Sequence, residues 1–253
     1  MSERHFRTWP ADPQRAVVAL VHGIAEHAGR YEHVAQRLNR HGYSAIAVDL
    51  TGHGNSPAWP GRVERSGDWH ADVDALLERA RSAAGSGPVF LLGHSLGALI
   101  VASYATERPA CAAGLILSAP AVLAGEAYLQ ASAEGSGVPP ETISRDPDVV
   151  RAYVEDPMVF HDRVGPELNA YALELAIVTN ADAGRIALPT LILQGGGDLI
   201  ADPEGTRDLF DALGAKDRTL RMYEGLYHEV LNEPEKDRVL DDLVAWLDER
   251  VPA

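Results

Sequence analysis

The sequence of 253 residues has few of the features that would assign it to a secreted, membrane-spanning or nucleic-acid-binding class. Cys111 is the only cysteine, which excludes an internal disulfide and a cysteine-based metal site. Basic residues are scarce: 22 Lys and Arg face 37 Asp and Glu, and the net charge of −15 argues against nucleic acid as a partner. The N-terminus is polar without a signal-peptide core, and no apolar run reaches membrane-spanning length. We therefore expect a cytoplasmic protein.

Apolar runs of strand length alternate with segments of helical periodicity along most of the chain. The strand-like runs cover residues 16–21, 43–50, 89–92, 114–120, 190–194 and 218–223. The helical patterns cover residues 31–42, 69–77 and 96–107, a segment after Pro203, and residues 239–247. This alternation predicts an α/β fold with a mostly parallel central sheet and helices on both faces. In such sheets the chemistry collects at the carboxyl ends of the strands.

Residues 121–188 interrupt this alternation. They contain no clear strand, but short helical patterns such as "PDVVRAYV" and turns such as "EGSGVPP". Because the alternation of strands and helices resumes afterwards, we expect a helical insertion rather than a separate domain. The predicted organisation is a core made of residues 1–120 and 189–253, with a helical cap at residues 121–188.

The segment "VFLLGHSLGALIVASYA" places a serine between two glycines where a strand becomes a helix. A Gly-x-Ser-x-Gly sequence in this context is typical of a nucleophile elbow, whose tight turn leaves no room for side chains at the glycines. Ser95 would then lie at the carboxyl end of a strand and at the positive end of a helix dipole. The alternative is a glycine-rich turn with a solvated serine, but the strand before it and the helix after it favour the elbow.

A nucleophilic serine needs a base, and the base needs an orienting acid. In folds with such an elbow the chain order is serine, acid, histidine. Asp198 follows the strand "TLILQ" within a few residues, and His228 is the one histidine beyond it, just after the last strand. Asp202 is the alternative acid. His94 is unsuited as the base, because it adjoins Ser95 on a sharp turn and its side chain should diverge.

The oxyanion of the tetrahedral intermediate needs two backbone donors. We predict the N–H of Leu96, directly after the nucleophile, and the N–H of Ile24, in the loop after the first buried strand. His22 is expected to brace that loop. The predicted mechanism is acyl transfer through a serine ester, which needs no metal and no organic cofactor.

Several longer motifs extend this interpretation, among them "HGIAEHAGRY", "DLTGHGNS", "GHSLGA", "SRDPDVVRAYVEDP" and "YEGLYHEVLNEP". They span nearly the whole chain and resemble the monoacylglycerol lipase family of α/β hydrolases. The resemblance implies an α/β-hydrolase fold and the cleavage of monoacylglycerols to glycerol and fatty acid. It implies the same triad of Ser95, Asp198 and His228, with Ile24 and Leu96 as oxyanion donors.

The resemblance also implies that the cap shields an acyl-chain tunnel and makes transient contact with membranes or micelles, which would place the protein at the membrane periphery. Glu26 and Arg30 fall in the first motif, and we expect them to form a buried brace of the oxyanion loop. Two departures from the family pattern stand out. Only fifteen residues precede Ala16, so the opening hairpin is expected to be reduced to one strand, and the cap is short before Ser144.

The apolar residues of the cap are the candidates for the acyl pocket, and their alternative role is packing between the helices of the cap. The candidates are Tyr128, Leu129, Val150, Tyr153, Val154, Met158 and Phe160. Because the cap is short, we expect monoacyl esters to be preferred over diacyl and triacyl esters, and short to medium chains over long ones.

The predicted partner is therefore a small-molecule ester or lipid, and the oligomeric state is left open. Three alternatives use the same fold. A general carboxylesterase or lysophospholipase would use the same triad on other esters, and a cofactor-free perhydrolase would use it with peroxide. A non-enzymatic ligand-binding module would have no reason to keep all three triad residues in order.

Overall fold

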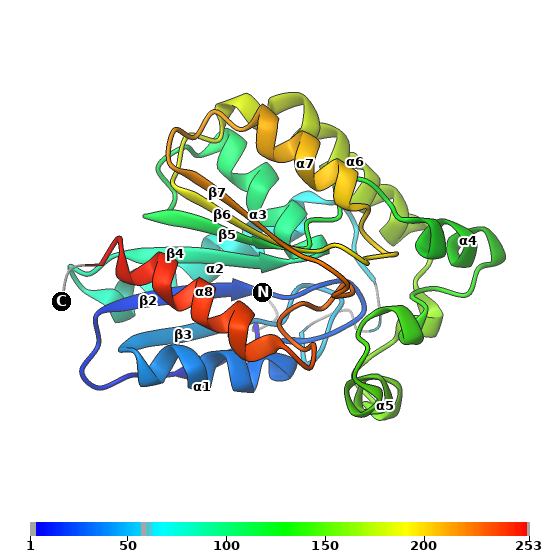
Figure 1. The fold of residues 1–253 in the computed structure, drawn as a ribbon, viewed down its shortest axis with the longest axis horizontal. Coiled ribbons are helices and arrows are strands. Elements are labelled where there is room, and N and C mark those ends of the chain that lie inside the picture. Colours follow the sequence, from blue (N-terminus) through cyan, green and yellow to red (C-terminus); the bar gives the residue numbers. More distant parts are fainter. Residues whose placement is uncertain (1–3, 57–59, 61, 252–253) are drawn as a thin grey trace.

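The computed structural model describes residues 4–56, 60 and 62–251. Within them, seven strands form one sheet in the order β1-β3-β2-β4-β5-β6-β7, in which all neighbours are parallel except β1 and β3 (Figure 1). The strands are β1 (Phe6–Trp9), β2 (Ala16–Val21), β3 (Tyr43–Val48), β4 (Val89–His94), β5 (Gly114–Ser118), β6 (Thr190–Gly195) and β7 (Arg218–Tyr223). The prediction of a mostly parallel α/β sheet is confirmed.

Alternate residues of the inner strands enter two separate cores, one on each face of the sheet. In β2, Val17, Ala19 and Val21 belong to one core, whereas Ala16, Val18 and Leu20 belong to the other. Both sets are almost fully buried, which explains why the strands read as continuous apolar runs rather than as alternating ones.

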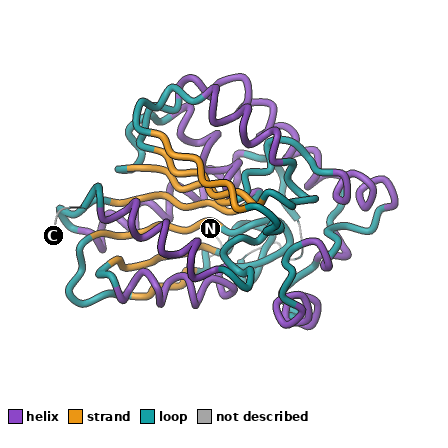
Figure 2. The backbone as a smooth tube through the Cα atoms, in the orientation of Figure 1, coloured by secondary structure: helices purple, strands orange, loops and turns teal. Residues whose placement is uncertain are grey.

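Helices cover both faces of the sheet (Figure 2). The first face carries α2 (Gly67–Ala84), α3 (Leu96–Glu107), α6 (Pro166–Asp182) and α7 (Pro203–Ala212). The second face carries α1 (Glu32–Arg40), which follows a 3-10 turn at Ala28–Tyr31, and α8 (Lys236–Asp248). In the described part of the chain, no helix is both long and apolar enough to span a membrane.

The elements agree closely with the sequence pattern. The strands at residues 16–21 and 218–223 and the helix at residues 96–107 have the predicted bounds, while α2 extends well beyond the predicted residues 69–77. The N-terminus contributes a single strand, as expected, and β1 pairs antiparallel with β3 from Phe6↔Val48 to Trp9↔Ala45.

Residues 121–188, predicted above to form a helical insertion, have two parts, and we keep the name insertion for them. Its first part holds α4 (Glu126–Glu134) and α5 (Pro147–Glu155), which project beyond the carboxyl edge of the sheet (Figure 1). Its second part, α6, packs along α3 and buries Leu168, Leu175 and Ala176 in the first core. Hydrogen bonds Gly125 N–H to Ile200 O (2.7 Å) and Asp202 N–H to Leu123 O (2.9 Å) join the start of the insertion to the loop after β6.

Candidate active site

The chain turns directly from β4 into α3 at Ser95, whose φ of 53° is rare for a residue with a side chain. Two close approaches explain the glycines on either side. A Cβ on Gly93 would lie 2.3 Å from the carbonyl oxygen of Gly97, and a Cβ on Gly97 would lie 2.3 Å from the carbonyl oxygen of Val21. The backbones of β2, β4 and α3 therefore meet at this turn, which holds Ser95 at the carboxyl edge of the sheet.

The loop after β2 folds back over Ser95. A Cβ on Gly23 would lie 3.3 Å from Ser95 Cβ and 3.0 Å from Glu26 Oε1, so this position also needs a small residue. Ile24 and Leu96, the two predicted oxyanion donors, line one cavity together with Ser95. Leu96 is the first residue of α3, where backbone N–H groups have no acceptor within the helix.

His22 braces this loop through a defined tautomer. The N–H of Leu50 donates to His22 Nε2 (3.0 Å), so the ring proton lies on Nδ1, which donates to the carbonyl oxygen of Gly23 (2.8 Å). Burial lowers the pKa of His22 against the opposing effect of Glu26, and the ring stays neutral at neutral pH. His22 therefore holds the backbone beside the predicted oxyanion donor without taking a charge.

Asp198 and His228, from the loops after β6 and β7, are joined by a hydrogen bond. His228 Nδ1 donates to Asp198 Oδ2 over 2.8 Å. The other oxygen, Oδ1, accepts the N–H groups of Ile200 and Ala201 (both 2.9 Å), and Oδ2 also accepts the side-chain amide of Gln194 (3.0 Å). The carboxylate is thus fixed by its own loop, and the imidazole that it orients keeps Nε2 available. His228 and Ser95 line the same cavity.

The interaction between Asp198 and His228 stabilises the protonated form of the His228 imidazole. Burial by itself raises the pKa of Asp198, but His228 and the hydrogen bonds outweigh it and leave the pKa below its ordinary value. Burial likewise lowers the pKa of His228, but Asp198 outweighs it and raises the pKa above its ordinary 6.5. Asp198 therefore stays ionised while His228 can accept a proton.

The two alternative residues have other partners. Asp202 caps the N-terminus of α7, where its side chain accepts the N–H of Glu204 (2.9 Å). His94 lies with Nδ1 3.1 Å from Ser118 Oγ, and its ring centroid is 4.9 Å from that of His228. Burial, and then the proximity of His228, lowers the pKa of His94 to about 4, so it is neutral at neutral pH. The structure brings Asp198, and not Asp202, to the histidine beside Ser95.

Glu26 and Arg30 form the expected buried brace. Glu26 Oε1 accepts the N–H of Gly23 (2.7 Å) and the hydroxyl of Tyr31 (2.6 Å), and Arg30 Nη1 donates to Glu26 Oε2 (2.8 Å). The same guanidinium forms a two-point pair with Glu229, with Nη1–Oε1 at 2.6 Å and Nη2–Oε2 at 2.8 Å. Arg30 thus links the loop after β2 to the residue that follows His228, a role that the motif alone did not predict.

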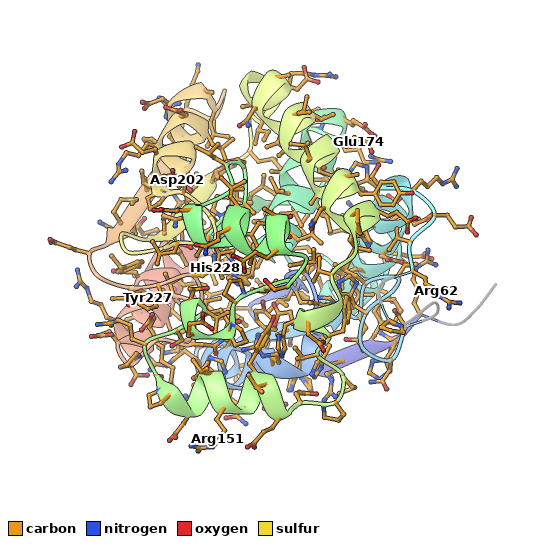
Figure 3. All side chains as sticks on the ribbon, turned by 90° about the vertical axis from the view of Figure 1, so that its right-hand side faces the viewer. Arg62, Arg151, Glu174, Asp202, Tyr227 and His228 are labelled. Atoms are coloured by element: carbon orange, nitrogen blue, oxygen red, sulfur yellow. The ribbon has the colours of Figure 1, made fainter. Side chains whose placement is uncertain are left out.

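The loop that carries His228 is also fastened to the insertion. The fully buried carboxylate of Glu233 accepts the N–H of Tyr227 (2.8 Å) through Oε1 and Arg145 Nε (3.0 Å) through Oε2. The N–H of Glu229 donates to the carbonyl oxygen of Ile143 (2.7 Å). In Figure 3, which looks onto this edge of the sheet, the labelled Tyr227 and His228 lie among the elements of the insertion.

Two cavities meet at Ser95, and the smaller one has the larger share of polar groups in its lining. One has a volume of about 380 Å³ and is mostly apolar. Residues of α3, α4, α6 and the loops after β5 and β6 line it, among them Leu96, Leu99, Val122, Leu123, Tyr128, Leu129, Asn169, Leu173, Ala176 and Ile200. The other, of about 20 Å³, holds the polar groups of Glu26, His94, His228 and Glu229, closed by Val138, Ile143 and Tyr153 of the insertion.

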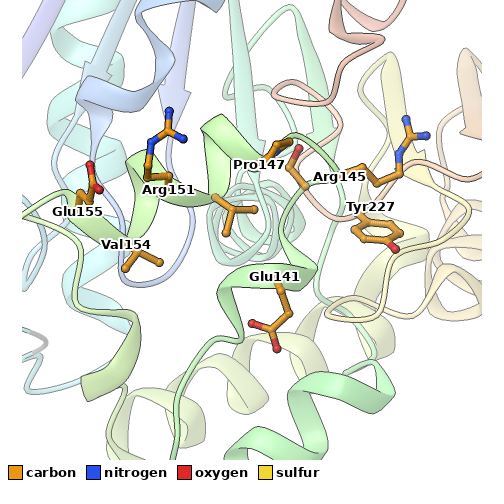
Figure 4. Close-up of a pocket in the computed structure, with 9 residues that line it drawn as sticks. Glu141, Arg145, Pro147, Arg151, Val154, Glu155 and Tyr227 are labelled. Carbon is orange, nitrogen blue, oxygen red and sulfur yellow. The ribbon is translucent and has the colours of Figure 1, made fainter.

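The seven pocket candidates separate into four groups. Tyr128 and Leu129 line the apolar cavity, and Tyr153 lines the polar one. Val150 and Val154 instead line an outer groove with Glu141, Arg145, Arg151 and Tyr227 (Figure 4), which shares no lining residue with either cavity. Neither residue lines a cavity at Ser95, and their place in the acyl pocket stays a prediction.

The last two candidates pack elsewhere. Phe160 is fully buried, with its ring 5.0 Å from that of His53, and its N–H donates to the carbonyl oxygen of Ala25 (3.0 Å). Met158 is half-buried, with its sulfur 3.5 Å from the side-chain amide of Asn55. Both contact loops of the core and neither is among the residues that line the apolar cavity, so their role in the acyl pocket also stays a prediction.

Sequence reasoning missed the contribution of α6 to the cavity. Asn169, Leu173 and Ala176 line it from this helix, and the hydroxyl of Tyr128 donates to Asn169 Oδ1 (2.6 Å). The signal was present, since α6 has apolar residues on more than one face and therefore needs two partners. Among the described residues, no group of three or more His, Cys, Asp or Glu has the arrangement of a metal site.

Comparison with known proteins agrees with the fold and the motifs. Residues 12–235 match the family model described as serine aminopeptidase, S33. A monoacylglycerol lipase of Mycolicibacterium smegmatis is 36% identical over 96% of this chain and 91% of the relative. The solved monoacylglycerol lipase of Paleococcus ferrophilus has a TM-score of 0.86 at 33% identity, over 98% of this chain and 99% of that structure. The phospholipase YtpA of Bacillus subtilis is 29% identical over 96% of this chain and 99% of the relative.

The sheet topology, the turn at Ser95 and these similarities define the protein as an α/β hydrolase that acts on carboxylic esters. Within that class, the chain belongs to the matched hydrolase family and, with the relatives from Mycolicibacterium smegmatis and Paleococcus ferrophilus, to the monoacylglycerol lipase family. The resemblance inferred from the motifs is confirmed.

Proposed function

We propose that the protein cleaves monoacylglycerols to glycerol and fatty acid, with Ser95, His228 and Asp198 as the catalytic triad. The observation that carries the proposal is the meeting of an apolar and a polar cavity at Ser95. A monoacylglycerol has the same two-sided character, because one apolar chain and one polar alcohol flank a single ester carbonyl. The similarity to monoacylglycerol lipases of two other organisms supports the same substrate.

The proposed reaction proceeds in two halves. Ser95 Oγ attacks the ester carbonyl while His228 Nε2 takes its proton, and the N–H groups of Ile24 and Leu96 stabilise the oxyanion. The intermediate collapses, the C–O bond to glycerol breaks, and His228 returns the proton to the leaving oxygen. Water then attacks the acyl-enzyme in the same way and releases the fatty acid. Asp198 holds the His228 tautomer and stabilises the imidazolium through the 2.8 Å hydrogen bond.

The cavity volumes favour one acyl chain of medium length. A volume of about 380 Å³ lies near the lower end of the roughly 300–1,000 Å³ that is usual for small-molecule pockets, which suits one acyl chain better than two. The polar cavity of about 20 Å³ holds only about one water, so glycerol enters only when Val138, Ile143 and Tyr153 move apart. A second acyl chain on the alcohol would have to enter this polar side, which disfavours diacyl and triacyl esters.

We further propose that the mouth of the apolar cavity makes transient contact with lipid aggregates. Leu123, Leu129 and Leu173 line the cavity and yet are 48%, 58% and 61% exposed. With a net charge of −15, the protein is not attracted to anionic lipid, so the contact must come from these apolar groups. We place the protein in the cytoplasm, at the periphery of membranes when it takes substrate.

The test is a substrate panel assayed below aggregation thresholds. It compares octanoyl monoacylglycerol with the matching diacyl and triacyl esters and with p-nitrophenyl octanoate, and uses Ser95→Ala as the control. We expect the monoacylglycerol to have the highest kcat/KM among the glycerides and Ser95→Ala to be inactive. A triacylglycerol as the best glyceride would refute the proposed substrate while leaving the triad intact.

Hydrolysis of a phospholipid is the second candidate, because one relative is a phospholipase. It would use the same triad and the same apolar cavity. The two candidates differ in the alcohol that leaves: glycerol is neutral, whereas a glycerophosphoryl group is negatively charged. The charges around the polar cavity therefore decide between them.

A further inference from the structure

The polar cavity beside Ser95 is lined by two carboxylates. Glu26 and Glu229 are 3% and 4% exposed, and both are among the residues that line this cavity. No Lys or Arg side chain is among the described residues that line it. The two lining histidines add no charge in the resting site at mildly alkaline pH: His94 has a pKa of about 4, and His228 must be neutral to act as a base.

The guanidinium of Arg30 pairs with both carboxylates. The N–O distances are 2.8 Å for Glu26 and 2.6 and 2.8 Å for Glu229, and the ring of Tyr153 covers the guanidinium at 4.6 Å. Two negative groups and one positive group leave a net charge of −1 around the cavity. Asp198, which is bonded to His228, adds a further negative charge, and a protonated imidazole would balance it.

The hydrogen-bond donors of this region are already committed to the carboxylates. The N–H of Gly23 and the hydroxyl of Tyr31 donate to Glu26, and the side-chain amide of Asn232 donates to Glu229 over 2.8 Å. A phosphate group needs several donors or cations to replace its water. Here it would meet acceptors instead, and part of the cost would be like-charge repulsion in a buried site.

We propose that the polar cavity excludes negatively charged leaving groups, and that Glu229 is the residue that determines this specificity. The inference rests on the proposed function, because it assumes that the alcohol leaves through the polar side. A monoacylglycerol would be accepted, and a monoacylglycerol that carries a phosphate monoester on its free primary hydroxyl would be rejected. The protein would thereby differ from a phospholipase although it has the same fold and elbow.

The experiment compares 1-hexanoylglycerol with 1-hexanoylglycerol 3-phosphate, two soluble esters with the same acyl chain and the same scissile bond. Fatty acid release gives kcat/KM for each in the full-length protein at pH 8. Since like charges that meet in a desolvated site cost several kcal/mol, we expect the phosphate ester to be about 100-fold worse. Equal kcat/KM for the two esters would overturn the proposal, and this result does not depend on any variant.

Glu229→Gln removes one negative charge and keeps the size and the acceptor oxygen of the side chain. We expect the ratio of the two kcat/KM values to fall about tenfold in this variant. Because both esters use the same base, a change in the pKa of His228 cancels in the ratio. The matched control is Glu141→Gln, which makes the same change in net charge at an exposed residue that lines the outer groove and neither cavity at Ser95.

A ratio that stays unchanged in Glu229→Gln, or falls equally in Glu141→Gln, would overturn the role of Glu229. In the second case the discrimination would come from the overall charge of the protein. If p-nitrophenyl hexanoate is hydrolysed but 1-hexanoylglycerol is not, the proposed function itself fails, and this inference fails with it. A selective wild type together with a reduced ratio in Glu229→Gln alone supports it.

Discussion

The two sides of Ser95 are built from different kinds of structure. The polar side consists largely of loops at the carboxyl edge of the sheet, in which buried groups such as Glu26 and Asp198 are held by two or more hydrogen bonds each. The apolar side is formed largely by α4 and α6, where Leu129 and Leu173 are more than half exposed.

Because the two sides differ in this way, we expect the polar side to control the rate of the reaction and the apolar side to control which substrate is preferred. Buried, fully paired polar groups tolerate little change, because removing one partner leaves the other unsatisfied in a site without water. Apolar contacts at the half-open mouth of the cavity are non-directional, and the binding free energy lost with them is proportional to the small apolar area that they bury. We therefore expect substitutions on the polar side to act strongly on turnover and substitutions on the apolar side to act mildly on substrate preference.

The largest effect is expected at the acid. Asp198→Asn should lower kcat about 10⁴-fold, because the amide would favour the wrong tautomer of His228. Asp202→Asn is the matched control: it should change kcat less than about twofold, since asparagine also caps a helix well. Steady-state kinetics on one ester measures both variants. The reverse ranking would show that Asp202 is the acid.

The next effect concerns the contact between the insertion and the loop of His228. Glu233→Gln removes the charge of a fully buried carboxylate that pairs with the partly exposed Arg145, and we expect a loss of about 2 kcal/mol in the free energy of unfolding and about tenfold in kcat. Glu235→Gln is the control, because Glu235 pairs with the same arginine at an exposed position.

Denaturant unfolding gives the free energy, and the labelling rate of Ser95 by a fluorophosphonate reports the position of the base. A purely structural role for Glu233 would lower the stability and leave the labelling rate of the folded protein unchanged. Equal effects of Glu233→Gln and Glu235→Gln would remove the special role of the buried carboxylate.

The pH dependence tests the electrostatics of the polar side. His228 must be neutral to accept a proton, so kcat/KM falls as the pH drops through its pKa. Since Asp198 raises this pKa above 6.5, more than half of His228 is protonated at pH 6.5, and kcat/KM there should be less than half of its alkaline plateau. Glu229 also raises this pKa, so Glu229→Gln should move the acid limb to lower pH. A rate that is highest near pH 5 would contradict His228 as the base.

The smallest effect is expected on the apolar side. Leu173→Ser should lower kcat/KM for octanoyl monoacylglycerol about fivefold relative to the butanoyl ester, because it removes apolar surface from the cavity. Ile177→Ser is the control, since Ile177 lies one turn further along α6 with the same 61% exposure but does not line the cavity. The ratio of the two esters below their aggregation thresholds is the measurement. An equal change in both variants would indicate a general effect of α6.

The same contrast explains what the sequence could predict. The sheet, the turn at Ser95 and the contact between Asp198 and His228 follow from short patterns, because apolar strand runs and Gly-x-Ser-x-Gly encode local geometry. The apolar cavity could not be predicted in this way. Val154 and Leu173 are both apolar residues of amphipathic or apolar helices, yet only Leu173 lines the cavity.

What separates those two residues is how α5 and α6 are placed against the rest of the chain. The Asp156–His27 bond and the packing of α6 on α3 join residues far apart in sequence, and no local spacing encodes them. The bidentate pair of Arg30 and Glu229 is another case, because its partners are 199 positions apart. Each partner lies in a motif that could be identified in the sequence, but neither motif predicts the contact between them.

The central claim is that ester hydrolysis proceeds through a covalent bond to Ser95. The most direct measurement is mass spectrometry of the intact and digested protein after treatment with a fluorophosphonate, beside Ser95→Ala treated in the same way. We predict one adduct per chain, located on the peptide that contains Ser95, with loss of esterase activity in proportion to labelling and no adduct on Ser95→Ala. An adduct on a different residue, or ester turnover that persists in pure Ser95→Ala, would contradict the account.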